Sequence, residues 1–557
     1  MSHAWYSSYP EGIPHEVDVN AFESLLDVFE QSCETYSNNP CFSNYGTTIN
    51  YHELSTHSKN LAAFLQNKLG LKKGDKVAIM MPNLLQNPVS IFAALRAGLT
   101  VVNTNPLYTG EELRHQLCDS GATTIIVLEN FASTLQSVIK DTPIKNTIVT
   151  RMGDMLSFPK SSLINLVVKH VKKMVPGYQL PGHYSFKQCL SEGSNLSYTR
   201  PEVHHQDTAF LQYTGGTTGV SKGAILTHGN MVANLQQVSA WIEPYTESGK
   251  EIVITALPLY HIFSLLANCM FFMKLGGLNY LITNPRDMKG FVKEIKHLKF
   301  TAFTGVNTLF NGLLNTPGFS DIDFSNFKLT LGGGMAVQAS VAEKWQQVTG
   351  QTLLEAYGLT ETSPAACINP MNLKSYNGKI GLPIPSTDVC IKDDNNNMLE
   401  AGDTGEICIK GPQVTQGYYN RPEETAQVFD EDGWFHTGDI GFMDEKGFFQ
   451  IVDRKKDMII VSGFNVYPNE IEAVISCHPN ILEVGVIGMP DEKSGEVVMA
   501  IVVCDQPEIT ADEIRAHCEL SLTRYKIPKR VEFVSEIPKT NVGKILRRQL
   551  RDMYFQS

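Results

Sequence analysis

Residues 213–223 (YTGGTTGVSKG) form the stretch whose composition points most directly to chemistry. After Tyr213, every residue except Val220 is glycine, serine, threonine or lysine. Glycines let backbone N–H groups turn toward an anion, hydroxyls add hydrogen-bond donors, and Lys222 adds a positive charge. This composition predicts a loop that holds a polyphosphate. It is not a Walker A loop, because Lys222 precedes a glycine, whereas G-x-x-x-x-G-K-[ST] requires Ser or Thr there.

Further glycine-containing polar segments follow this loop along the chain. Taken singly, each has a plain structural interpretation: a run of three glycines is a turn, and a lysine near the C-terminus is solvated. Together, the segments are of chemical interest because there are several of them and they follow one another in a set order. These polar segments are residues 332–334, 355–362, 434–439, 462–470 and 538–548.

The elements that must position these segments alternate between buried strands and helices through the first three-quarters of the chain. Strands are expected at 77–80, 100–103, 124–127, 252–256, 301–304 and 328–331, and helices at 53–69 and 87–97, among others. This alternation predicts parallel sheets covered by helices, an α/β fold. Between 379 and 450, short alternating strands with Gly/Asp turns (388–392, 405–410 and 448–452) indicate a small β subdomain. The remaining ~100 residues suffice for one small α+β domain.

A dense charge run, residues 453–457 (DRKKD), lies between two apolar strands. It is either a solvated hairpin turn or a linker between domains. We place a domain boundary here, with residues 1–453 in a large N-terminal domain and 454–557 in a C-terminal domain.

Residues 162–175 have the pattern of a basic amphipathic helix. At ~100° per residue, one face carries apolar side chains and the other carries three lysines, His170 and Asn165, with Leu166 the single misfit. Such a helix either lies in a membrane interface or packs on the protein core with its lysines in water, and the pattern leaves both open. The apolar face comprises Leu163, Ile164, Val167, Val168, Val171, Met174 and Val175.

Composition excludes several classes of protein. The net charge of −12 argues against nucleic acid as a partner, because no global basic field is present. The eleven cysteines contain no C-x-x-C pair or zinc-like spacing, which favours reduced thiols and a cytoplasmic location. The first 20 residues contain no Lys or Arg and no apolar core, so they do not form a signal peptide.

Residues 252–273 are long enough for a membrane span and carry no Asp, Glu, Lys or Arg. Pro258, His261 and Asn268 interrupt the run, so we expect a buried strand, a turn and a buried helix, and no transmembrane helix.

In this order, the segments closely resemble the adenylate-forming superfamily of acyl-CoA synthetases, luciferases and peptide-synthetase adenylation domains. The resemblance extends from about Leu25 to Leu550. Within the superfamily, the chain is most similar to bacterial long-chain fatty-acid–CoA ligases of β-oxidation. The matching stretches are 211–229 (LQYTGGTTGVSKGAILTHG), 255–263 (TALPLYHIF), 284–287 (NPRD), 304–310 (TGVNTLF) and 451–472 (IVDRKKDMIIVSGFNVYPNEIE).

The resemblance implies a two-step reaction. AMP is transferred from ATP to a carboxylate with release of pyrophosphate, and CoA then attacks the acyl-adenylate and releases AMP. Lys544, Thr360 and Glu361 are the implied catalytic residues, with Glu361 and Thr214 at Mg²⁺. The implied nucleotide site is Thr214, Gly215, Gly216, Thr217, Thr218, Gly219 and Lys222 for the phosphates; Gly333, Glu355, Ala356 and Tyr357 for adenine; and Asp439 with Arg454 for ribose.

The resemblance also implies that the C-terminal domain is mobile. It rotates about a hinge at Lys456 between the two steps, so that Lys544 leaves the site and the Gly463 region approaches with CoA. His261 is placed beside the acyl site and Val306 in the acyl channel, with Leu309 and Phe310 as further lining; a buried structural role for His261 remains the alternative.

The expected partners are a fatty acid, ATP and CoA, the cytoplasmic face of a membrane through peripheral contact, and a second copy of the chain. Two other functions remain open. One is an acyl-AMP ligase that uses another acceptor or a medium-chain or aromatic acid; the other is a catalytically silent nucleotide-binding protein. The set of Glu361, Asp439 and Lys544 argues against the second, because a pure binder needs no mobile lysine.

Overall fold

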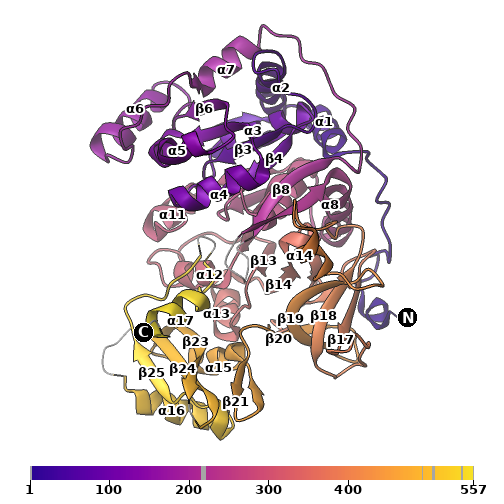
Figure 1. Cartoon of the computed structure of the whole chain (residues 1–557), viewed down its shortest axis with the longest axis vertical. Helices are drawn as coiled ribbons and strands as arrows, with labels where there is room; N and C mark the ends of the chain where they lie inside the picture. The colour runs from indigo at the N-terminus through magenta and orange to yellow at the C-terminus, as the bar shows by residue number, and fades with distance from the viewer. Residues whose placement is uncertain (1–2, 215–220, 492, 505–508, 541–542, 556–557) are drawn as a thin grey trace.

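The computed structural model describes residues 3–214, 221–491, 493–504, 509–540 and 543–555 (Figure 1). Two helix-covered sheets build a large N-terminal domain, a four-stranded sheet forms a small β subdomain, and a smaller C-terminal domain lies at one end. The α/β class and this division into a large and a small domain agree with the sequence prediction.

The first sheet of the N-terminal domain has seven strands in the order β7-β6-β5-β3-β4-β8-β9. Its strands are parallel except β9, which returns antiparallel to β8. Strands β4 and β5 are buried along their whole length, as expected for a parallel sheet covered on both faces. The strands are β3 (Lys76–Met80), β4 (Thr100–Asn103), β5 (Thr124–Leu128), β6 (Asn146–Thr150), β7 (Tyr184–Ser185), β8 (Thr208–Thr214) and β9 (Lys222–Thr227).

The second sheet has nine strands in the order β16-β15-β14-β13-β12-β10-β11-β1-β2. Its centre is parallel, so the carboxyl ends of β12, β13 and β14 meet at one edge, where ligands bind in open α/β sheets. The strands are β1 (Pro40–Asn44), β2 (Thr47–Asn50), β10 (Ile252–Thr255), β11 (Leu278–Leu281), β12 (Ala302–Gly305), β13 (Leu329–Gly333), β14 (Leu353–Gly358), β15 (Ala365–Ile368) and β16 (Leu382–Pro383).

Helices cover these sheets, and local sequence explains several of their ends. Asn50 and Glu53 form a capping box at α2, and Thr109 and Glu112 form another at α4. Every residue of α3 is buried. The helices are α1 (Leu25–Thr35), α2 (Tyr51–Asn67), α3 (Gln86–Arg96), α4 (Gly110–Ser120), α5 (Ala132–Val138), α6 (Lys160–Leu166), α7 (Phe186–Gly193), α8 (His228–Ile242), α9 (Ile262–Ser264), α10 (Phe271–Lys274), α11 (Met288–Ile295), α12 (Asn307–Leu314) and α13 (Ala339–Thr349).

The β subdomain is an antiparallel sheet in the order β17-β18-β19-β20. An N-terminal arm, residues 3–15, fastens onto it. His3 Nε2 lies 2.8 Å from Asp388 Oδ1, and the Ser8 hydroxyl donates to the Lys446 carbonyl at 2.7 Å. The elements are β17 (Asp388–Lys392), β18 (Gly405–Lys410), α14 (Pro422–Ala426), β19 (Phe435–Met443) and β20 (Phe449–Arg454).

The C-terminal domain has its own five-stranded sheet and its own apolar core. Its strands run β22-β21-β24-β23, with β25 pairing with β24. The elements are β21 (Ile459–Val461), β22 (Phe464–Val466), α15 (Pro468–Ser476), β23 (Ile481–Asp491), β24 (Gly495–Cys504), α16 (Ala511–Glu519), β25 (Arg530–Phe533) and α17 (Arg547–Phe555).

The charge run at 453–457 is a connection between two sheets. Its first two residues end strand β20 of the β subdomain, whereas β21 after it belongs to the C-terminal sheet. The hairpin interpretation is therefore wrong, and the linker interpretation agrees with the structure. The boundary at 453/454 and the hinge at Lys456 stay predictions.

Residues 252–273 form β10, a turn, and the helical segments α9, η6 (Leu265–Met270) and α10, as expected. Most of these residues are buried within the N-terminal domain. In the part of the chain that the structure describes, no helix combines the length and apolarity needed to cross a membrane.

The segment 158–174 differs from the single-faced helix expected there. Helix α6 continues into η4 (Val167–Val171), a π-helical turn, and the wider turn changes the phase of the side chains. Val168 is buried and Ile164 packs against the core, as the packed alternative predicted. Four other apolar side chains are exposed: Leu163, Leu166, Val171 and Met174.

Candidate active site

The two ends of the phosphate loop are held side by side at the edge of the seven-stranded sheet. Thr214 ends β8 and pairs directly with Lys222, which begins β9. The Tyr213 hydroxyl donates to Asp119 Oδ2 at 2.7 Å, and Arg421 binds the other oxygen of that carboxylate at 2.7 Å. Of the predicted phosphate ligands, Gly215, Gly216, Thr217, Thr218 and Gly219 lie outside the described residues.

Glu361 lies in the single turn η7 (Thr360–Thr362), against which β9 packs. Its side chain is buried, and Oε1 accepts a 2.7 Å hydrogen bond from the Tyr418 hydroxyl. The Tyr418 ring also lies 5.4 Å from Lys222 Nζ, within cation–π range. Thr360 begins the same turn, so the structure brings Thr360, Glu361 and the phosphate-loop lysine to one place.

The carboxyl ends of β13 and β14 form the predicted adenine wall. Gly333 is paired with Ala356, and a Cβ added to Gly333 would lie 2.9 Å from the Ala356 carbonyl oxygen. The glycine therefore permits close approach of two strands. Glu355 turns its carboxylate away, accepting from the Val337 N–H at 2.8 Å, and burial raises its pKa to about 7. The carboxylate of Glu355 is thus engaged within the protein, and any contact with adenine is predicted to be made through its backbone.

Asp439, in β19, is held by two of the other predicted residues. Its Oδ2 accepts from the Tyr357 hydroxyl at 2.6 Å, and its Oδ1 lies 2.9 Å from Arg454 Nε. The Asp439 carboxylate raises the pKa of the Arg454 guanidinium. Asp439 and Arg454 face each other because β19 and β20 pair in that register. The three residues therefore form one network beside the adenine wall.

Lys544 reaches this site from the C-terminal domain. It follows Gly543, which has a φ of +84° and lies so close to Thr308 that a Cβ would come within 2.3 Å of Oγ1. A Cβ built on Gly334 would lie 3.5 Å from Lys544 Cε and 4.0 Å from Nζ. Burial lowers the pKa of Lys544 to about 8; Arg454 acts in the same direction, and the Asp439 and Glu361 carboxylates oppose it. One site thus contains groups from both domains.

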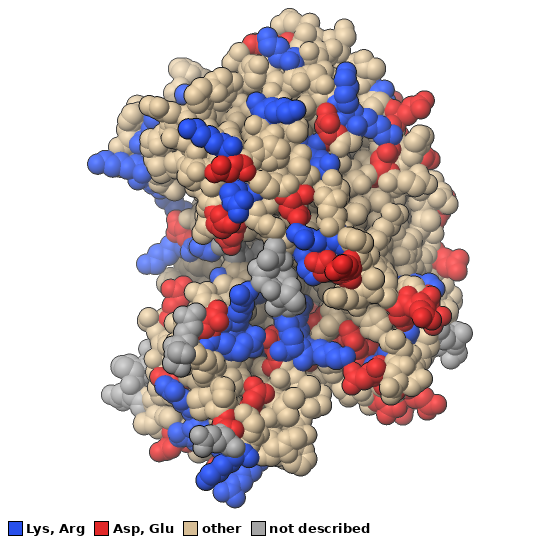
Figure 2. All heavy atoms as spheres, viewed as in Figure 1, with Lys and Arg blue, Asp and Glu red and all other residues tan. Residues whose placement is uncertain are grey.

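The positive charge around this site is local. Figure 2 shows Lys and Arg side chains on both sides of the hollow where the C-terminal domain meets the rest of the molecule. The chain as a whole carries a net charge of −12. Asp and Glu side chains lie among them, so the Lys and Arg side chains offer local positive charges that can contact an anionic small molecule.

His261 and Val306 both lie near Lys544. His261 caps α9 through Nδ1, which accepts from the Phe263 N–H at 3.4 Å, and burial together with the Lys544 charge lowers its pKa to about 3. The imidazole is therefore neutral. Val306 packs between Gly334 and Gly543. Phe310 instead belongs to an aromatic core cluster with Phe303 and Trp345.

The predicted CoA residue lies apart from these groups, whereas the predicted hinge residue lies within electrostatic reach of Arg454 and Asp439. Gly463 forms the exposed β21–β22 turn with a φ of +85°, and a Cβ there would meet nothing within 4 Å. Lys456 is exposed and is the second residue after β20. The orientation seen here therefore brings in Lys544 and leaves Gly463 in the open.

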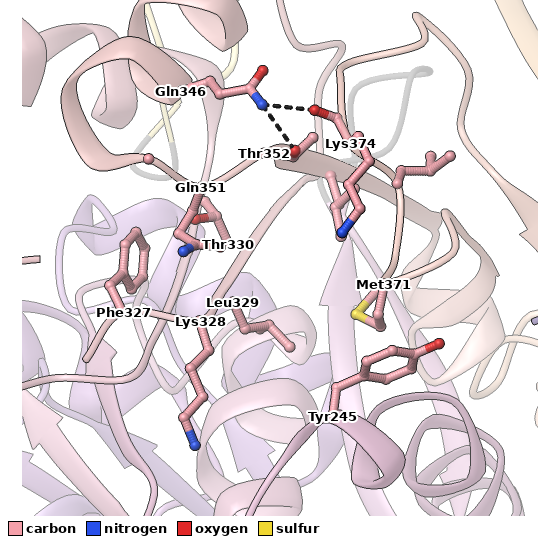
Figure 3. A pocket seen from close by; sticks show the side chains of 13 residues that line it. Tyr245, Phe327, Lys328, Leu329, Thr330, Gln346, Gln351, Thr352, Met371 and Lys374 are labelled. Carbon is pink, nitrogen blue, oxygen red and sulfur yellow. Dashed lines mark hydrogen bonds between the residues drawn. The ribbon is translucent and has the colours of Figure 1, made fainter. Parts of the chain in front are cut away.

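A separate cavity of about 500 Å³ lies at the opposite, amino-terminal ends of β13 and β14 (Figure 3). Leu329, Thr330 and Thr352 line it, together with Tyr245 and Lys374 from neighbouring loops. None of the predicted site residues that the structure describes lines this cavity.

The donor set at Glu361 fits Mg²⁺. In the described ranges, no group of three or more His, Cys, Asp or Glu side chains is arranged to hold a metal ion. Mg²⁺ that binds mainly through substrate phosphates needs only one or two carboxylates. Glu361, with the Thr214 hydroxyl at the neighbouring loop end, supplies hard oxygen donors of that kind.

Sequence reasoning missed several residues of this arrangement. Tyr418 joins Glu361 to Lys222, and Asp119 with Arg421 fastens the strand before the phosphate loop. The sequence Gly417-Tyr418-Tyr419 offered a weak signal as a glycine-aromatic turn. Asp119 offered none, since it lies 302 residues from Arg421 in the chain.

Comparison with known proteins agrees with this geometry. The family model described as AMP-binding enzyme matches residues 29–419, and that of the AMP-binding enzyme C-terminal domain matches 470–544. A long-chain-fatty-acid–CoA ligase of Yersinia pestis is 54% identical over 552 residues, covering 99% of this chain and 98% of the relative. One of Bacillus subtilis is 40% identical over 549 residues, covering 98% and 97%.

Among solved structures, ATP-bound MatB from Rhodopseudomonas palustris is 27% identical, with a TM-score of 0.80 over 95% of this chain and 99% of that one. The anthranilate CoA ligase AuaEII in complex with anthranoyl-AMP has a TM-score of 0.85 over 96% and 98%, and at 23% identity it supports the fold alone. With both family models matched along the chain and relatives at 54% identity, this protein belongs to the AMP-binding, adenylate-forming enzyme family.

Proposed function

We propose that this protein is an ATP-dependent ligase that joins a long-chain fatty acid to CoA through an acyl-adenylate. The observation that carries the proposal is the placement of Lys544, a lysine of the C-terminal domain, beside Gly334 and within electrostatic reach of Asp439 and Glu361. A protein that only binds nucleotide has no need of such a residue. The names of the full-length relatives support CoA as acceptor and a long-chain acid as substrate.

In the first step, a carboxylate oxygen of the fatty acid forms a bond to the α-phosphorus of ATP while the bond to the pyrophosphate oxygen breaks. Negative charge gathers around that phosphorus, so donors and cations aimed there lower the barrier. Lys544 bridges the attacking carboxylate and the α-phosphate, and Thr360 donates to the α-phosphate. Lys222 and the Thr214 hydroxyl hold the departing phosphates, and Asp439 accepts from the ribose hydroxyls.

Glu361 and Thr214 are the residues that would hold Mg²⁺, which when bound neutralises phosphate charge and orients the pyrophosphate as a leaving group. The Tyr418 hydroxyl holds one oxygen of the Glu361 carboxylate in place. Glu361 is the only acidic residue of η7, whose other two residues are threonines. The turn therefore presents a fixed negative charge toward the loop that binds phosphates.

In the second step, the thiol of CoA loses its proton to solvent, and its sulfur bonds to the acyl carbon as the bond to the AMP oxygen breaks. We propose that the C-terminal domain, residues 454–557, first rotates about Lys456, which withdraws Lys544 and brings Gly463 to the site. The open surface around Gly463 supports this role. Because Gly463 has no side chain, it leaves room beside the turn for the narrow pantetheine arm of CoA.

The acyl chain is expected to enter beside His261 and Val306. The low pKa of His261 keeps its imidazole uncharged, which suits contact with an apolar chain.

The acyl-CoA product is the form in which fatty acids enter β-oxidation. That role in the pathway, together with a cytoplasmic location, is part of the proposal.

Peripheral contact with a membrane is also part of the proposal, at the segment 158–174. Phe158, Leu163 and Val171 are 86%, 61% and 67% exposed. Residues 155–191 contain five lysines and no Asp or Glu. Lys and Arg side chains project from the edge where Figure 1 places α6 (Figure 2). Apolar side chains beside lysines suit the interface of an anionic bilayer, where the substrate also partitions.

ATP–pyrophosphate exchange stimulated by fatty acids of graded chain length tests the first step. Long-chain acids should stimulate exchange most, and absence of stimulation by any carboxylate would refute the proposal. AMP release with CoA, compared with an acyl carrier protein, separates the ligase from an acyl-AMP ligase with another acceptor. Sedimentation velocity decides whether the chain forms the homodimer that remains a prediction.

A further inference from the structure

Asp453 makes a contact that crosses from the β subdomain to the C-terminal domain. It lies in β20 and is fully buried. Its Oδ1 accepts from the Arg454 N–H at 2.7 Å, and its Oδ2 accepts from the Asn469 N–H at 2.7 Å. Arg454 precedes the predicted hinge at Lys456, whereas Asn469 lies in the first turn of α15 on the other side of it. One carboxylate therefore joins the two domains.

The same contact is connected to the segment that carries Lys544. Arg547, three residues after Lys544, donates to Asn469 Oδ1 at 2.6 Å and to Glu472 Oε2 at 2.8 Å. Arg547 also lies 3.5 Å from Asp457 Oδ2. Asn469 is thus held by Asp453 through its backbone and by Arg547 through its side chain. A change in the position of α15 relative to β20 is transmitted to the lysine segment.

Directional hydrogen bonds, rather than a close ion pair, contact the carboxylate of Asp453. No Lys or Arg of the described residues lies within 4.0 Å of its oxygens, and burial raises its pKa, opposed by the Arg547 charge and the two N–H donors. The Asn469 N–H, in the first turn of α15, therefore adds to the stabilisation that the Arg547 charge and the Arg454 N–H provide. That interaction exists only while the helix points at β20.

Among the described residues outside the linker 454–458, two further hydrogen bonds join segments on opposite sides of Lys456, and both are longer. The Thr308 hydroxyl donates to the Gly543 carbonyl at 3.4 Å, and Asn311 Nδ2 donates to the Leu482 carbonyl at 3.3 Å. Both involve neutral groups, which make weaker hydrogen bonds than a carboxylate does. The contact at Asp453 is therefore the strongest of the three that favour this orientation.

We propose that Asp453 is a positioning residue that holds the C-terminal domain in the orientation that places Lys544 in the active site. The inference rests on the two-step function proposed above. A large rotation at Lys456 turns α15 away from β20 and separates Asp453 from the Asn469 N–H. The first step thus proceeds with the contact formed, and the second step requires that it break.

Asp453→Ala and Asp453→Asn test this inference through the two half-reactions. A hydrogen bond to a buried charged group favours its conformation by about tenfold or more. We expect Asp453→Ala to lower ATP–pyrophosphate exchange about tenfold, while acyl-CoA formation from supplied acyl-adenylate stays within twofold of wild type. Asp453→Asn keeps one acceptor oxygen, so its rate of ATP–pyrophosphate exchange should lie between those of Asp453→Ala and the wild type. Equal losses in both half-reactions, or no loss in either, would overturn the inference.

Glu472→Gln is the matched control. It weakens the same Arg547 cluster, but both partners lie within the C-terminal domain. It should lower the melting temperature and leave the ratio of the two half-reaction rates unchanged. The same shift in ratio as in Asp453→Ala would mean that general loosening of this domain causes the effect, and the inference would fall.

A distance measurement tests the orientation without relying on activity. Cys118 and Cys477 are exposed, one in each domain, and accept spin labels once the half-exposed Cys390 and Cys504 are replaced by serine. Without ligand, the wild-type chain should give one main distance, and Asp453→Ala a second, substantially populated one. Identical distributions would contradict the inference. Absence of exchange in the wild type would instead refute the proposed function, and the distances would still test the contact.

Discussion

The Tyr418 hydroxyl donates a 2.7 Å hydrogen bond to Glu361 Oε1, and it does so from a segment that is also bonded to the phosphate-loop hairpin. In that segment, the Tyr419 N–H donates to the Gly223 carbonyl at 2.8 Å, and the Thr415 N–H donates to the Glu361 carbonyl at 2.7 Å. The carboxylate that would hold Mg²⁺ and the hairpin that carries the phosphate loop are therefore both hydrogen-bonded to one segment, residues 415–419. Their spacing is set before any nucleotide binds.

Tyr418→Phe should lower the rate of ATP–pyrophosphate exchange about tenfold. The ring over Lys222 remains, but Glu361 loses a hydrogen bond of the kind worth about 1.5–3 kcal/mol when one partner is charged. Tyr419→Phe is the control, since that neighbouring tyrosine lies beside Lys76 rather than Glu361. Equal rates for the two variants would show that the hydroxyl of Tyr418 has no such role.

Lys544→Ala should lower adenylation at least a hundredfold, because its charge acts where negative charge develops. Acyl-CoA formation from supplied acyl-adenylate should be nearly unaffected, since Lys544 is expected to be withdrawn during that step. Separate assays of the two half-reactions provide the measurement. Comparable losses in both would contradict the assignment of Lys544 to the first step.

The pH dependence of adenylation should report the lowered pKa of Lys544, about 8 against an ordinary value of 10.5. The protonated lysine is the active form, so kcat/KM for ATP should be level below pH 8 and fall as the pH rises above it. Thioester formation from acyl-adenylate serves as the control and should show no such fall. An exchange rate that stays level to pH 10 would exclude an essential lysine with this pKa.

Glu355 should make folding stability depend on pH in a defined direction. Burial raises its pKa from 4.5 to about 7, so the folded protein holds this proton more tightly than the unfolded chain does. Stability is therefore lost as the pH rises from about 4.5 to 7, by an amount on the order of 3 kcal/mol. Glu355→Gln keeps an acceptor for the Val337 N–H and removes the ionisation. Its melting temperature relative to wild type should be higher at pH 8 than at pH 5; an unchanged difference would refute this.

The segment 158–174 should bind anionic vesicles. Combined replacement of Phe158, Leu163 and Val171 by serine should weaken binding to phosphatidylglycerol-containing vesicles at least tenfold, because each buried apolar side chain contributes roughly 1.5–3 kcal/mol. Leu520→Ser is the control, since Leu520 is 83% exposed but lies in the C-terminal domain. Co-sedimentation gives the measurement, and equal binding of the two variants would place the membrane contact elsewhere.

The sheets could be predicted well because buried parallel strands appear as short continuous apolar runs. The expected strands 100–103, 388–392 and 405–410 have the bounds found in the structure, and 77–80 and 252–256 differ by one residue. The segment 162–175 was less predictable. A fixed angle of 100° per residue assumes an α-helix, and the π-helical turn η4 rotates Val171 away from the face of Val168.

Site residues that belong to continuous motifs could be identified, because glycines and polar residues occur there in a fixed order. The structure brings Glu361, Asp439, Arg454 and Lys544 together accordingly. Contacts between isolated residues left no pattern in the sequence. The bond from Asn469 to Asp453 and that from Arg421 to Asp119 depend on how whole elements pack, and no local rule relates the partners.

The N-terminal arm has a consequence for the synthesis of the protein. His3 and Ser8 contact Asp388 and Lys446, separated in the chain by 385 and 438 residues. The arm therefore cannot dock until most of the polypeptide has left the ribosome. These residues are made long before their partners, so assembly of the large domain is completed only when the β subdomain has formed.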